Sequence, residues 1–545
     1  MKDFVVITQA KSIDYLRNYV SLPRSYGTTK YYEREDIQEI IQTVKRNLSE
    51  LNKYNLFVDQ LQRKKVILKP NLVSVQHKFG FQKSDYPETT DPRVIDAIIH
   101  FIKPYTEEIV IAESSGRGMP TRLSFKMTGL NRLAKYHNIR LVPLEEQPVD
   151  RYFLPKAKVM QEILIPKIFS EVVDGKAFYI SIPKMKTNLY TKVTLGFKNS
   201  MGIIPYYLRQ RDHNYNLVEK LVDILYLLKP DLVIIDGIIG GEGNAPAPVE
   251  PILSNVIVSG TNCVETDRVA AKLMGFDPKE IRLITRATKL GFGNPNVTVI
   301  GEVEPTPFKP ADRSLFSETF NSQYPNVRVL IGHTKNNPPE ISSIEEVTPE
   351  IVKEIEKACL GGCTASIRTA LENIKYQGHS TEFELTIIIG TGIEIQGEKY
   401  YFDKKSRAYG YSDIEKLSGK KIAMGNCSSW VSPITNVYIS GCMPKPIEPI
   451  KKVYKLINIS NNHFNPFKNK FLIPYILSKI KQQRTRKRLI KKGLWIDCLP
   501  DLGEKNHPTK PLDPKEKKKD YILWPFPTMT SEIKKRFLQR EKFSI

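Results

Sequence analysis

The sequence predicts an α/β protein with a first domain built on a doubly wound, mostly parallel sheet and a second, smaller α/β domain. Apolar runs of strand character, such as "KKVILKPNLV" (64–73) and "LVIIDGIIG" (232–240), alternate with segments of helical apolar spacing, such as "DPRVIDAIIHFIKPY". Strands that alternate with helices indicate a doubly wound sheet with helices on both faces. The chain has 545 residues, which is too many for one ordinary hydrophobic core.

We expect three parts along the chain. Residues 1–325 form the first α/β domain, which ends in a linker rich in proline and polar residues. Residues 326–458 form a smaller α/β domain that begins with the strand "VRVLIG" and contains four cysteines. Residues 459–545 form a basic extension, in which "SKIKQQRTRKRLIKKGLW" (478–495) is expected to be a helix.

Composition limits the class of protein. A content of 41% hydrophobic and 26% charged residues is typical of a soluble globular chain, and no apolar run has the length that spans a bilayer. The first residues lack the apolar core of a secretion signal, so the expected location is the cytoplasm. Six cysteines in so long a chain do not make a disulfide framework, and clustered thiols in a reducing compartment indicate metal or redox chemistry.

Four cysteines fall within the second predicted domain. Cys359 and Cys363 are four residues apart around two glycines, which favour a break in the helix predicted for "TPEIVKEIEKACLGGCTASIRTALENIKYQ". Cys427 and Cys442 directly follow the strands "KKIAMGN" and "NVYISG". Because the carboxyl ends of parallel strands meet at one edge of a sheet, these thiolates are candidate ligands of a [4Fe–4S] cluster.

Two other interpretations of these thiols stay open. The four cysteines could be reduced core residues that behave as small hydrophobic groups, or they could bind zinc, which usually takes more closely spaced pairs. The "GCMP" end resembles the iron–sulfur subunits of hydrogenases and of respiratory complex I in short motifs only. Cys263 and Cys498 lie outside this unit and are expected to be structural.

A group of polar residues follows the strand "AFYISIPK" in the first domain. Lysines beside hydroxyl and amide groups at a strand end suit an anionic ligand such as a phosphate, a carboxylate or a nucleotide. A solvated loop would also contain lysines. The candidates in this stretch are Lys184, Lys186, Thr187, Asn188, Lys198 and Asn199.

Further polar residues are expected near the same sheet edge. Asn71 follows "LKP", and Ser115 and Gly116 in "ESSGRG" offer backbone N–H groups ahead of a helix. Asp236 ends the apolar strand "LVIID", and Glu242 lies in the glycine-rich loop "GGEGNAP". The predicted catalytic residues, which would orient a ligand or move protons, are Lys184, Lys186, Asp236, Glu242 and His213; the other polar candidates would bind the substrate or a cofactor.

Several motifs occur together in a recognisable order. "KPNLV", "TDPRVIDAII", "IPKMKTN", "LGFKNSMGI", "IIDGIIGGEGNAP" and "ETDRVAAKLMGFDP" resemble the domain of unknown function 362 family over about residues 60–295. The resemblance implies a cytoplasmic protein that is often associated with iron–sulfur clusters through an attached ferredoxin-like module. No ferredoxin cysteine run is present, so the cysteine-containing domain would take its place. The lysine motif of the family usually ends in histidine, where this chain has Asn188.

The basic residues concentrate at the end of the chain. Between Lys451 and Ile545 there are 24 Lys and Arg against 8 Asp and Glu, although the whole chain has a formal charge of +23. Such a segment suits an anionic membrane surface, nucleic acid phosphates or an acidic electron-transfer protein, and it would otherwise be a solvated helix.

These observations lead to one main hypothesis and two alternatives. The main hypothesis is a redox-active iron–sulfur protein, an oxidoreductase if it is an enzyme, that binds an anionic small molecule in the first domain and a cluster in the second. The first alternative is an isomerase, lyase or transferase that acts on an anionic metabolite with zinc or without metal. The second is a scaffold that binds nucleic acid or a membrane through the basic extension.

Overall fold

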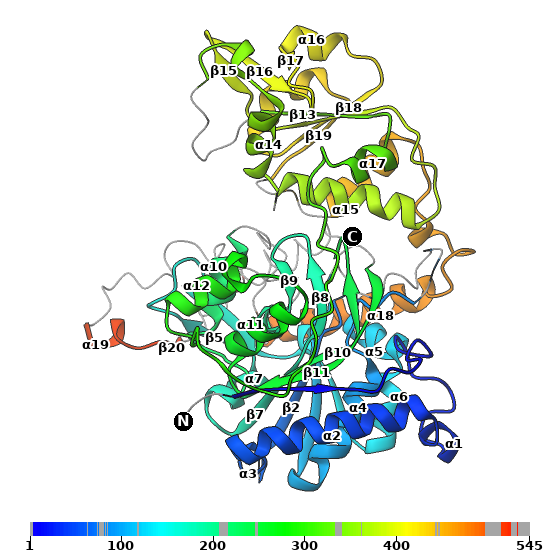
Figure 1. Cartoon of the computed structure of the whole chain (residues 1–545), viewed down its shortest axis with the longest axis vertical. Helices are drawn as coiled ribbons and strands as arrows, with labels where there is room; N and C mark the ends of the chain where they lie inside the picture. The colour runs from blue at the N-terminus through cyan, green and yellow to red at the C-terminus, as the bar shows by residue number, and fades with distance from the viewer. Residues whose placement is uncertain are drawn as a thin grey trace.

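The computed structural model contains two large sheets that lie in separate halves of the molecule (Figure 1). Both are mixed sheets; parallel strand pairs predominate in the larger one, and the smaller one has three parallel and three antiparallel pairs. Helices cover both faces, so the predicted α/β class is confirmed. The structure describes residues 4–62, 64–73, 75, 81, 83, 85–116, 119–205, 216–245, 249–332, 341–360, 362–441, 444, 447–495, 514–524 and 531.

The larger sheet has the strand order β12-β1-β11-β10-β7-β2-β3-β4, with β8 and β9 attached to β10. Strands β10, β7, β2, β3 and β4 run parallel, whereas β11 is antiparallel to both β10 and β1. The bounds are β1 Phe4–Gln9, β2 Lys65–Pro70, β3 Glu108–Glu113, β4 Arg140–Pro143, β7 Ala177–Ile182, β8 Lys184–Asn188, β9 Lys192–Thr194, β10 Leu232–Glu242, β11 Glu250–Gly260 and β12 Thr298–Ile300.

Each face of this sheet has its own hydrophobic core, because alternate strand residues point in opposite directions. Val66 and Leu68 of β2 pack on one face, and Ile67 packs on the other. Figure 1 shows α2, α4 and α6 of the first face at the bottom of the molecule and α10, α11 and α12 of the second face above the sheet. The first face carries α2 (Glu35–Asn55), α4 (Pro92–Ile102), α5 (Thr121–Thr128) and α6 (Leu130–His137); the second carries α7 (Lys167–Val173), α8 (Gly196–Asn199), α10 (Leu217–Ile224), α11 (Cys263–Leu273) and α12 (Arg282–Lys289).

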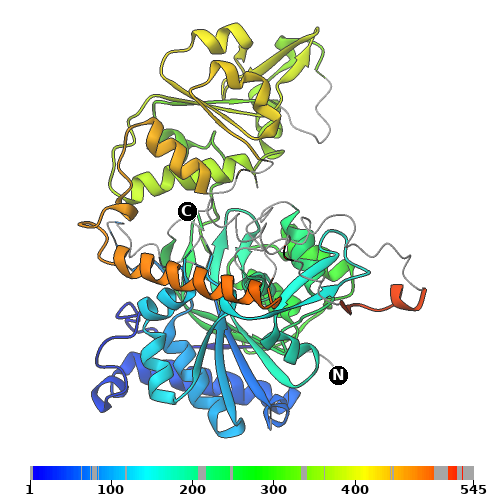
Figure 2. The same cartoon turned by 180° about the vertical axis from the view of Figure 1, so that it is seen from behind.

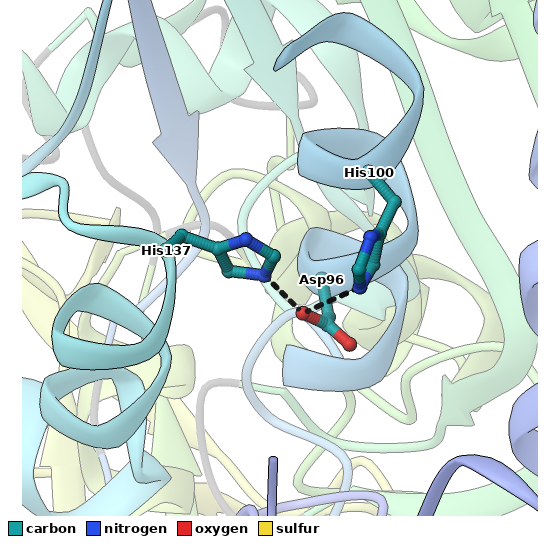
Figure 3. Close-up of side chains that lie close together, drawn as sticks. All are labelled: Asp96, His100 and His137. Carbon is teal, nitrogen blue, oxygen red and sulfur yellow. Dashed lines mark hydrogen bonds and ion pairs between the residues drawn. The ribbon is translucent and has the colours of Figure 1, made fainter. Parts of the chain in front are cut away.

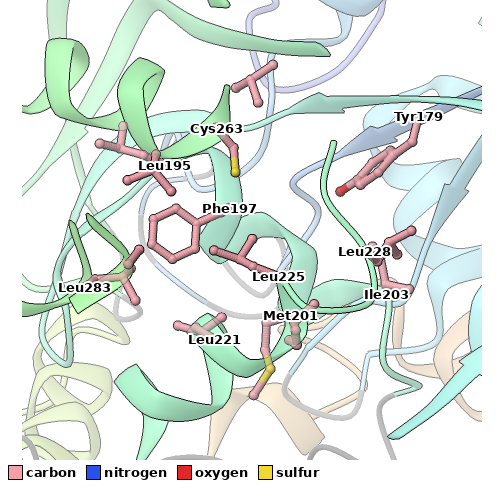
Figure 4. Close-up of a cluster of buried hydrophobic side chains, with 14 of the residues drawn as sticks. Tyr179, Leu195, Phe197, Met201, Ile203, Leu221, Leu225, Leu228, Cys263 and Leu283 are labelled. Atoms are coloured by element: carbon pink, nitrogen blue, oxygen red, sulfur yellow. The ribbon is translucent and has the colours of Figure 1, made fainter. Parts of the chain in front are cut away.

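The second face is closed by a compact apolar cluster (Figure 4). Phe197, Leu225 and Leu283 come from different segments and point into the same space. Cys263 lies among these side chains, and its burial raises the pKa of the thiol well above the ordinary value. The prediction that Cys263 is structural is therefore consistent with its apolar surroundings.

The smaller sheet has the strand order β15-β16-β13-β14-β18-β19, with β17 paired to β16. Strands β13, β14, β18 and β19 are parallel and β16 is antiparallel to β13. Helices α14 (Pro349–Lys357), α15 (Cys363–Tyr376) and α17 (Ile447–Leu456) accompany the strands, and α16 (Tyr411–Lys416) lies across the sheet from them. The strands are β13 Val327–Ile331, β14 Leu385–Ile389, β15 Ile393–Ile395, β16 Glu398–Phe402, β17 Ala408–Tyr409, β18 Lys420–Met424 and β19 Val437–Ile439.

The long helix that the sequence predicts around "ACLGGCTAS" is interrupted. Helix α14 ends at Lys357, a short turn carries Cys359, and α15 begins at Cys363. The two cysteines are therefore separated into a turn and a helix start, in agreement with the predicted break.

The segment after the smaller sheet returns to the larger one. Helix α18 (Leu472–Lys491) lies along the outside of the first half of the molecule (Figure 2). A three-stranded sheet joins β20 (Ile522–Trp524) to β5 (Val149–Phe153), which also pairs with β6 (Glu162–Pro166). The basic extension thus packs on the first domain in part, and among the described residues no helix combines the length and apolarity needed to cross a bilayer.

Candidate functional site

The larger sheet carries a cluster of buried charged and amide side chains at the carboxyl ends of its parallel strands. Lys69 and Glu113 come from the ends of β2 and β3, and Lys184 begins β8, which follows β7. Asp236 of β10 is in register with Lys184. Ligands of open α/β sheets bind at this edge, so the structure brings together polar residues from four adjacent segments at the expected place.

Lys184 and Asp236 form the innermost pair of this cluster. Lys184 Nζ lies 2.8 Å from Asp236 Oδ2, and both side chains are fully buried. The same oxygen accepts the backbone N–H of Asp91 at 2.7 Å, whereas Asp236 Oδ1 has no hydrogen-bond partner among the described residues. Burial raises the pKa of Asp236 and the lysine opposes that shift. A carboxyl in such surroundings is suited to hold or release a proton.

Lys69 and Glu113 form a second buried pair beside the first. Lys69 Nζ lies 2.7 Å from Glu113 Oε2 and 2.9 Å from Asn199 Oδ1. Asn199 Oδ1 also accepts a hydrogen bond from Asn71 Nδ2 at 3.3 Å, so the two predicted amides are hydrogen-bonded to each other. Gly202 covers this pair closely, because a Cβ there would lie 2.5 Å from Glu113 Oε1 and 2.6 Å from Lys69 Nζ.

The other residues of β8 have different roles. Lys186 Nζ donates to Asn71 Oδ1 at 3.0 Å and to the Glu88 carbonyl at 2.5 Å, which places it in the same cluster. Thr187 Oγ1 donates to the Gly243 carbonyl and holds the loop that follows β10. Asn188 Oδ1 accepts three donors from Tyr190 and Thr191, so this amide shapes its own turn.

The "ESSGRG" loop uses its first backbone N–H groups internally. Ser114 N donates to the Gly202 carbonyl, Ser115 N to Thr121 Oγ1, and Gly116 N to the Val73 carbonyl. Ser115 Oγ donates to Ser124 Oγ in the same buried region. These N–H groups of Ser115 and Gly116, which the sequence suggested for an anion, are therefore engaged within the protein.

The remaining predicted polar residues lie around this cluster or outside the described part of the chain. Glu242, at the end of β10, accepts the backbone N–H of Lys309 at 2.8 Å and holds the linker segment. Lys198, in α8, is half-buried and lies 3.4 Å from Thr194 Oγ1. His213 is outside the described residues.

In the smaller sheet, two of the four predicted thiols approach each other at Gly425. This glycine follows β18 and has φ +92°. A Cβ on Gly425 would lie 2.9 Å from Cys363 Sγ, 3.3 Å from Cys427 Sγ and 3.7 Å from the Gly441 carbonyl oxygen. The two sulfurs are therefore no farther apart than the sum of the first two distances, and the strand that precedes Cys442 ends beside them.

Of the other two cysteines, Cys359 alone lies within the described residues. Cys359 is half-buried in the turn before α15, where its carbonyl accepts Gly362 N and Thr364 Oγ1. Cys442 is outside the described residues. Four thiolates around one zinc ion would lie about 3.8 Å apart, given Zn–S bonds of about 2.3 Å. No group of three potential metal ligands that includes a cysteine is found among the described residues.

A separate cluster of potential metal ligands lies on the opposite side of the sheet. Asp96 and His100 of α4 and His137 of α6 turn toward one another (Figure 3), with their ligand atoms within 4.8 Å. His137 Nε2 is 2.6 Å from Asp96 Oδ1, and Tyr26 OH is also 2.6 Å from that oxygen. Ligands that share a tetrahedral zinc ion lie about 3.3 Å apart or more. The geometry is therefore that of a hydrogen-bonded group that joins α4 to α6.

The fold and the site place this chain in one class of protein. It has a doubly wound α/β domain with buried lysines, carboxylates and amides at its strand ends. Residues 66–272 match the model of the family described as Domain of unknown function (DUF362). Thylakoid-associated protein sll1697 of Synechocystis sp. (strain ATCC 27184 / PCC 6803 / Kazusa) is 29% identical over 132 residues. That match covers 23% of this chain and 40% of the relative's length.

Sequence reasoning missed Lys69 and Glu113. Both were visible as charged residues at the ends of the apolar runs "KKVILKP" and "EEIVIAE". A charge that directly follows buried strand residues must be paired or ligand-bound, and this signal could have identified both.

Proposed function

We propose that this chain is a redox-active iron–sulfur protein whose first domain binds an anionic small molecule. The ligands of a [4Fe–4S] cluster would be Cys359, Cys363, Cys427 and Cys442. The observation that carries the proposal is the approach of Cys363 Sγ and Cys427 Sγ at Gly425, with the carbonyl of Gly441, which precedes Cys442, beside them.

The spacing of the thiols supports a cluster over a single zinc ion. Each thiolate of a [4Fe–4S] cluster binds a different iron, so its four sulfurs stand farther apart than the ligands of one ion. Among the described residues, the group of potential ligands close enough to share one ion is Asp96, His100 and His137, and it contains no cysteine. Gly425 leaves space between two of the sulfurs, and a side chain there would enter that space.

The start of α15 adds an electrostatic reason. Cys363 is the first residue of this 14-residue helix. The positive end of the helix dipole stabilises a thiolate and a negatively charged cluster. Zinc or no metal would instead favour the non-redox alternative, an isomerase, lyase or transferase.

The buried polar cluster of the first domain would receive the anionic substrate. Lys186 is hydrogen-bonded to Asn71 there and supplies positive charge for an anion, and Asp236 has an oxygen suited to proton transfer. Helix α15 joins the two sites, since its far end contacts the first domain through Tyr376 on Tyr86 and Glu372 on Asn244. At 1.5 Å per residue, α15 is about 21 Å long. The iron–sulfur cluster would thus exchange electrons without touching the substrate, and an acidic electron-transfer protein would be its partner.

Anaerobic purification with iron and sulfide analysis tests this function. We expect about four iron and four sulfide per chain, with an electron paramagnetic resonance signal after reduction. Cys363→Ser and Cys427→Ser should lose most of the iron. Cys263→Ser is the matched control, because Cys263 is buried in the apolar core of the other sheet, and it should retain iron.

A colourless protein without iron after anaerobic reconstitution would overturn the redox proposal. If the purified protein contains stoichiometric zinc and the Cys363→Ser variant loses it, the non-redox alternative is favoured. Equal iron retention in all three variants would show that other residues hold the metal.

A further inference from the structure

Helix α18 is held on the first domain by its inner side. Gln482 Nε2 donates to the buried carboxylate of Glu145 at 2.9 Å. Phe471 and Tyr475 pack against an apolar group that includes Met119 and Leu123. Figure 2 shows α18 as a long helix across the outside of this half of the molecule. These contacts fix the orientation of α18. The outer side of the helix is the side opposite to them.

The outer side of the first half of α18 is apolar. Ile473, Ile476, Leu477 and Ile480 recur at the spacing that normally faces a protein core, yet all four are exposed. The preceding segment adds two exposed phenylalanines, and Phe467 is 97% exposed. We call this set the apolar stripe: Phe464, Phe467, Ile473, Ile476, Leu477 and Ile480.

The same outer side becomes basic in the second half of the helix. Lys481, Arg484, Arg488 and Lys491 are exposed and continue the spacing of the apolar stripe, and we call them the basic stripe. The sequence contains no Asp or Glu between Glu448 and Asp497, so no neighbouring carboxylate along this segment offsets these charges.

We propose that the outer side of α18 docks on an anionic phospholipid surface. A helix that lies in the membrane interface places apolar side chains at the boundary with the acyl chains and lysine or arginine among the headgroups. The apolar and basic stripes share one side of one helix, which supplies both. Nucleic acid would match the basic stripe alone, since phosphates do not favour exposed Ile, Leu and Phe. The chain would lie on the membrane and not cross it, and this docking does not depend on the proposed cluster.

Vesicle sedimentation with the full chain tests the proposal. We expect binding to phosphatidylcholine vesicles that contain 30% phosphatidylglycerol, and much weaker binding to phosphatidylcholine alone. Lys481→Gln/Arg484→Gln should weaken binding to the anionic vesicles about 25-fold, at roughly fivefold per removed charge. Ile473→Gln/Leu477→Gln should weaken it at least tenfold, which is roughly the effect of no longer burying one aliphatic side chain.

Two matched controls separate docking from general effects. Arg282→Gln/Lys289→Gln removes the same charge from exposed positions of α12, and Leu56→Asn removes an exposed apolar side chain next to α2. Both should bind vesicles like the unchanged protein. All variants should unfold at the same urea concentration, since every substituted side chain is exposed.

Three outcomes would overturn the proposal. The first is no binding to anionic vesicles, or binding that the α12 variant weakens as much as the α18 variants. The second is binding to a DNA or RNA duplex, without vesicle binding, that depends on the basic stripe alone. The third is a dimer in light scattering that Ile473→Gln/Leu477→Gln converts to a monomer while vesicles do not bind, which would assign the apolar stripe to a second copy of the chain.

Discussion

Lys184 and Asp236 are joined by an ion pair of 2.8 Å between Nζ and Oδ2, and neither side chain is exposed to solvent. The pair connects β8 to β10 at the edge of the sheet where ligands bind. A buried pair of this kind is costly to break, because the remaining charge has no water to solvate it. Lys184 therefore has a structural role in the absence of any ligand.

The first prediction concerns the loss of this lysine. Lys184→Met leaves Asp236 buried without its cation and should lower the free energy of unfolding by about 3 to 5 kcal/mol at neutral pH. Burial already raises the pKa of Asp236, and the variant removes the group that opposes this rise. A carboxyl whose native pKa lies above its unfolded value loses stability as the pH rises through the native pKa. The variant should thus approach the unchanged protein in acid, as measured by urea unfolding at several pH values.

The double variant Lys184→Met/Asp236→Asn is the control for this prediction. It removes both charges and keeps an oxygen that can accept the backbone N–H of Asp91. Its stability should recover by about 2 kcal/mol or more relative to Lys184→Met, which a double-mutant cycle measures. A double variant that is less stable than Lys184→Met would show that the ion pair is not the reason for the loss.

The second prediction concerns the glycine between the two sulfurs. Gly425→Ala places a Cβ 2.9 Å from Cys363 Sγ and 3.3 Å from Cys427 Sγ, so iron retention should fall strongly after anaerobic reconstitution. Gly397→Ala is the matched control, since Gly397 has φ +82° and no atom near its Cβ position. It should lose about 1 kcal/mol of stability from backbone strain and keep its iron. Equal iron content in the two variants would argue against metal binding beside Gly425.

The strands and helices that form this framework were largely predictable. The strand predicted at 177–184 overlaps β7, and Asp91 with Pro92 begins α4 as its sequence indicates. Asp91 accepts the backbone N–H of Arg93 in that cap. These features depend on local spacing and capping, which a sequence displays directly.

The partners of the polar side chains were not predictable. Lys184 and Lys186 are two residues apart, yet one pairs with Asp236 and the other with Asn71 and a backbone carbonyl. Strand order decides which distant residue stands beside each lysine, and sequence spacing does not contain that order. The outward apolar stripe of α18 was missed for a related reason, because helical apolar spacing normally indicates a buried face.

The third prediction concerns the close cover over the Lys69–Glu113 pair. Gly202→Ala would place a Cβ 2.5 Å from Glu113 Oε1 and 2.6 Å from Lys69 Nζ, so the pair must separate or the loop must move. The free energy of unfolding should fall by about 1 to 3 kcal/mol. Gly410→Ala is the control, because its nearest neighbour would be 3.5 Å away, and it should lose less than about 1 kcal/mol, since alanine is a weaker N-cap of α16 than glycine. Urea unfolding that finds equal losses would contradict this account.

The last prediction concerns Lys479, on the inner part of α18. Burial lowers the pKa of Lys479 to about 8, Arg486 acts in the same direction and Glu145 opposes it. Between pH 8 and the ordinary lysine value of 10.5, the unfolded chain binds a proton that the native chain has released. The free energy of unfolding should therefore rise with pH through this window, by about 3 kcal/mol for this one group.

The variant Lys479→Met isolates this contribution. It should be more stable than the unchanged protein below pH 8, and the difference should shrink as the pH rises to 10.5, as measured by urea unfolding at matched ionic strength. Lys481→Met, at an exposed position of the same helix, is the control and should leave the pH dependence unchanged. A constant difference between Lys479→Met and the unchanged protein across this range would show that Lys479 keeps its proton in the folded chain.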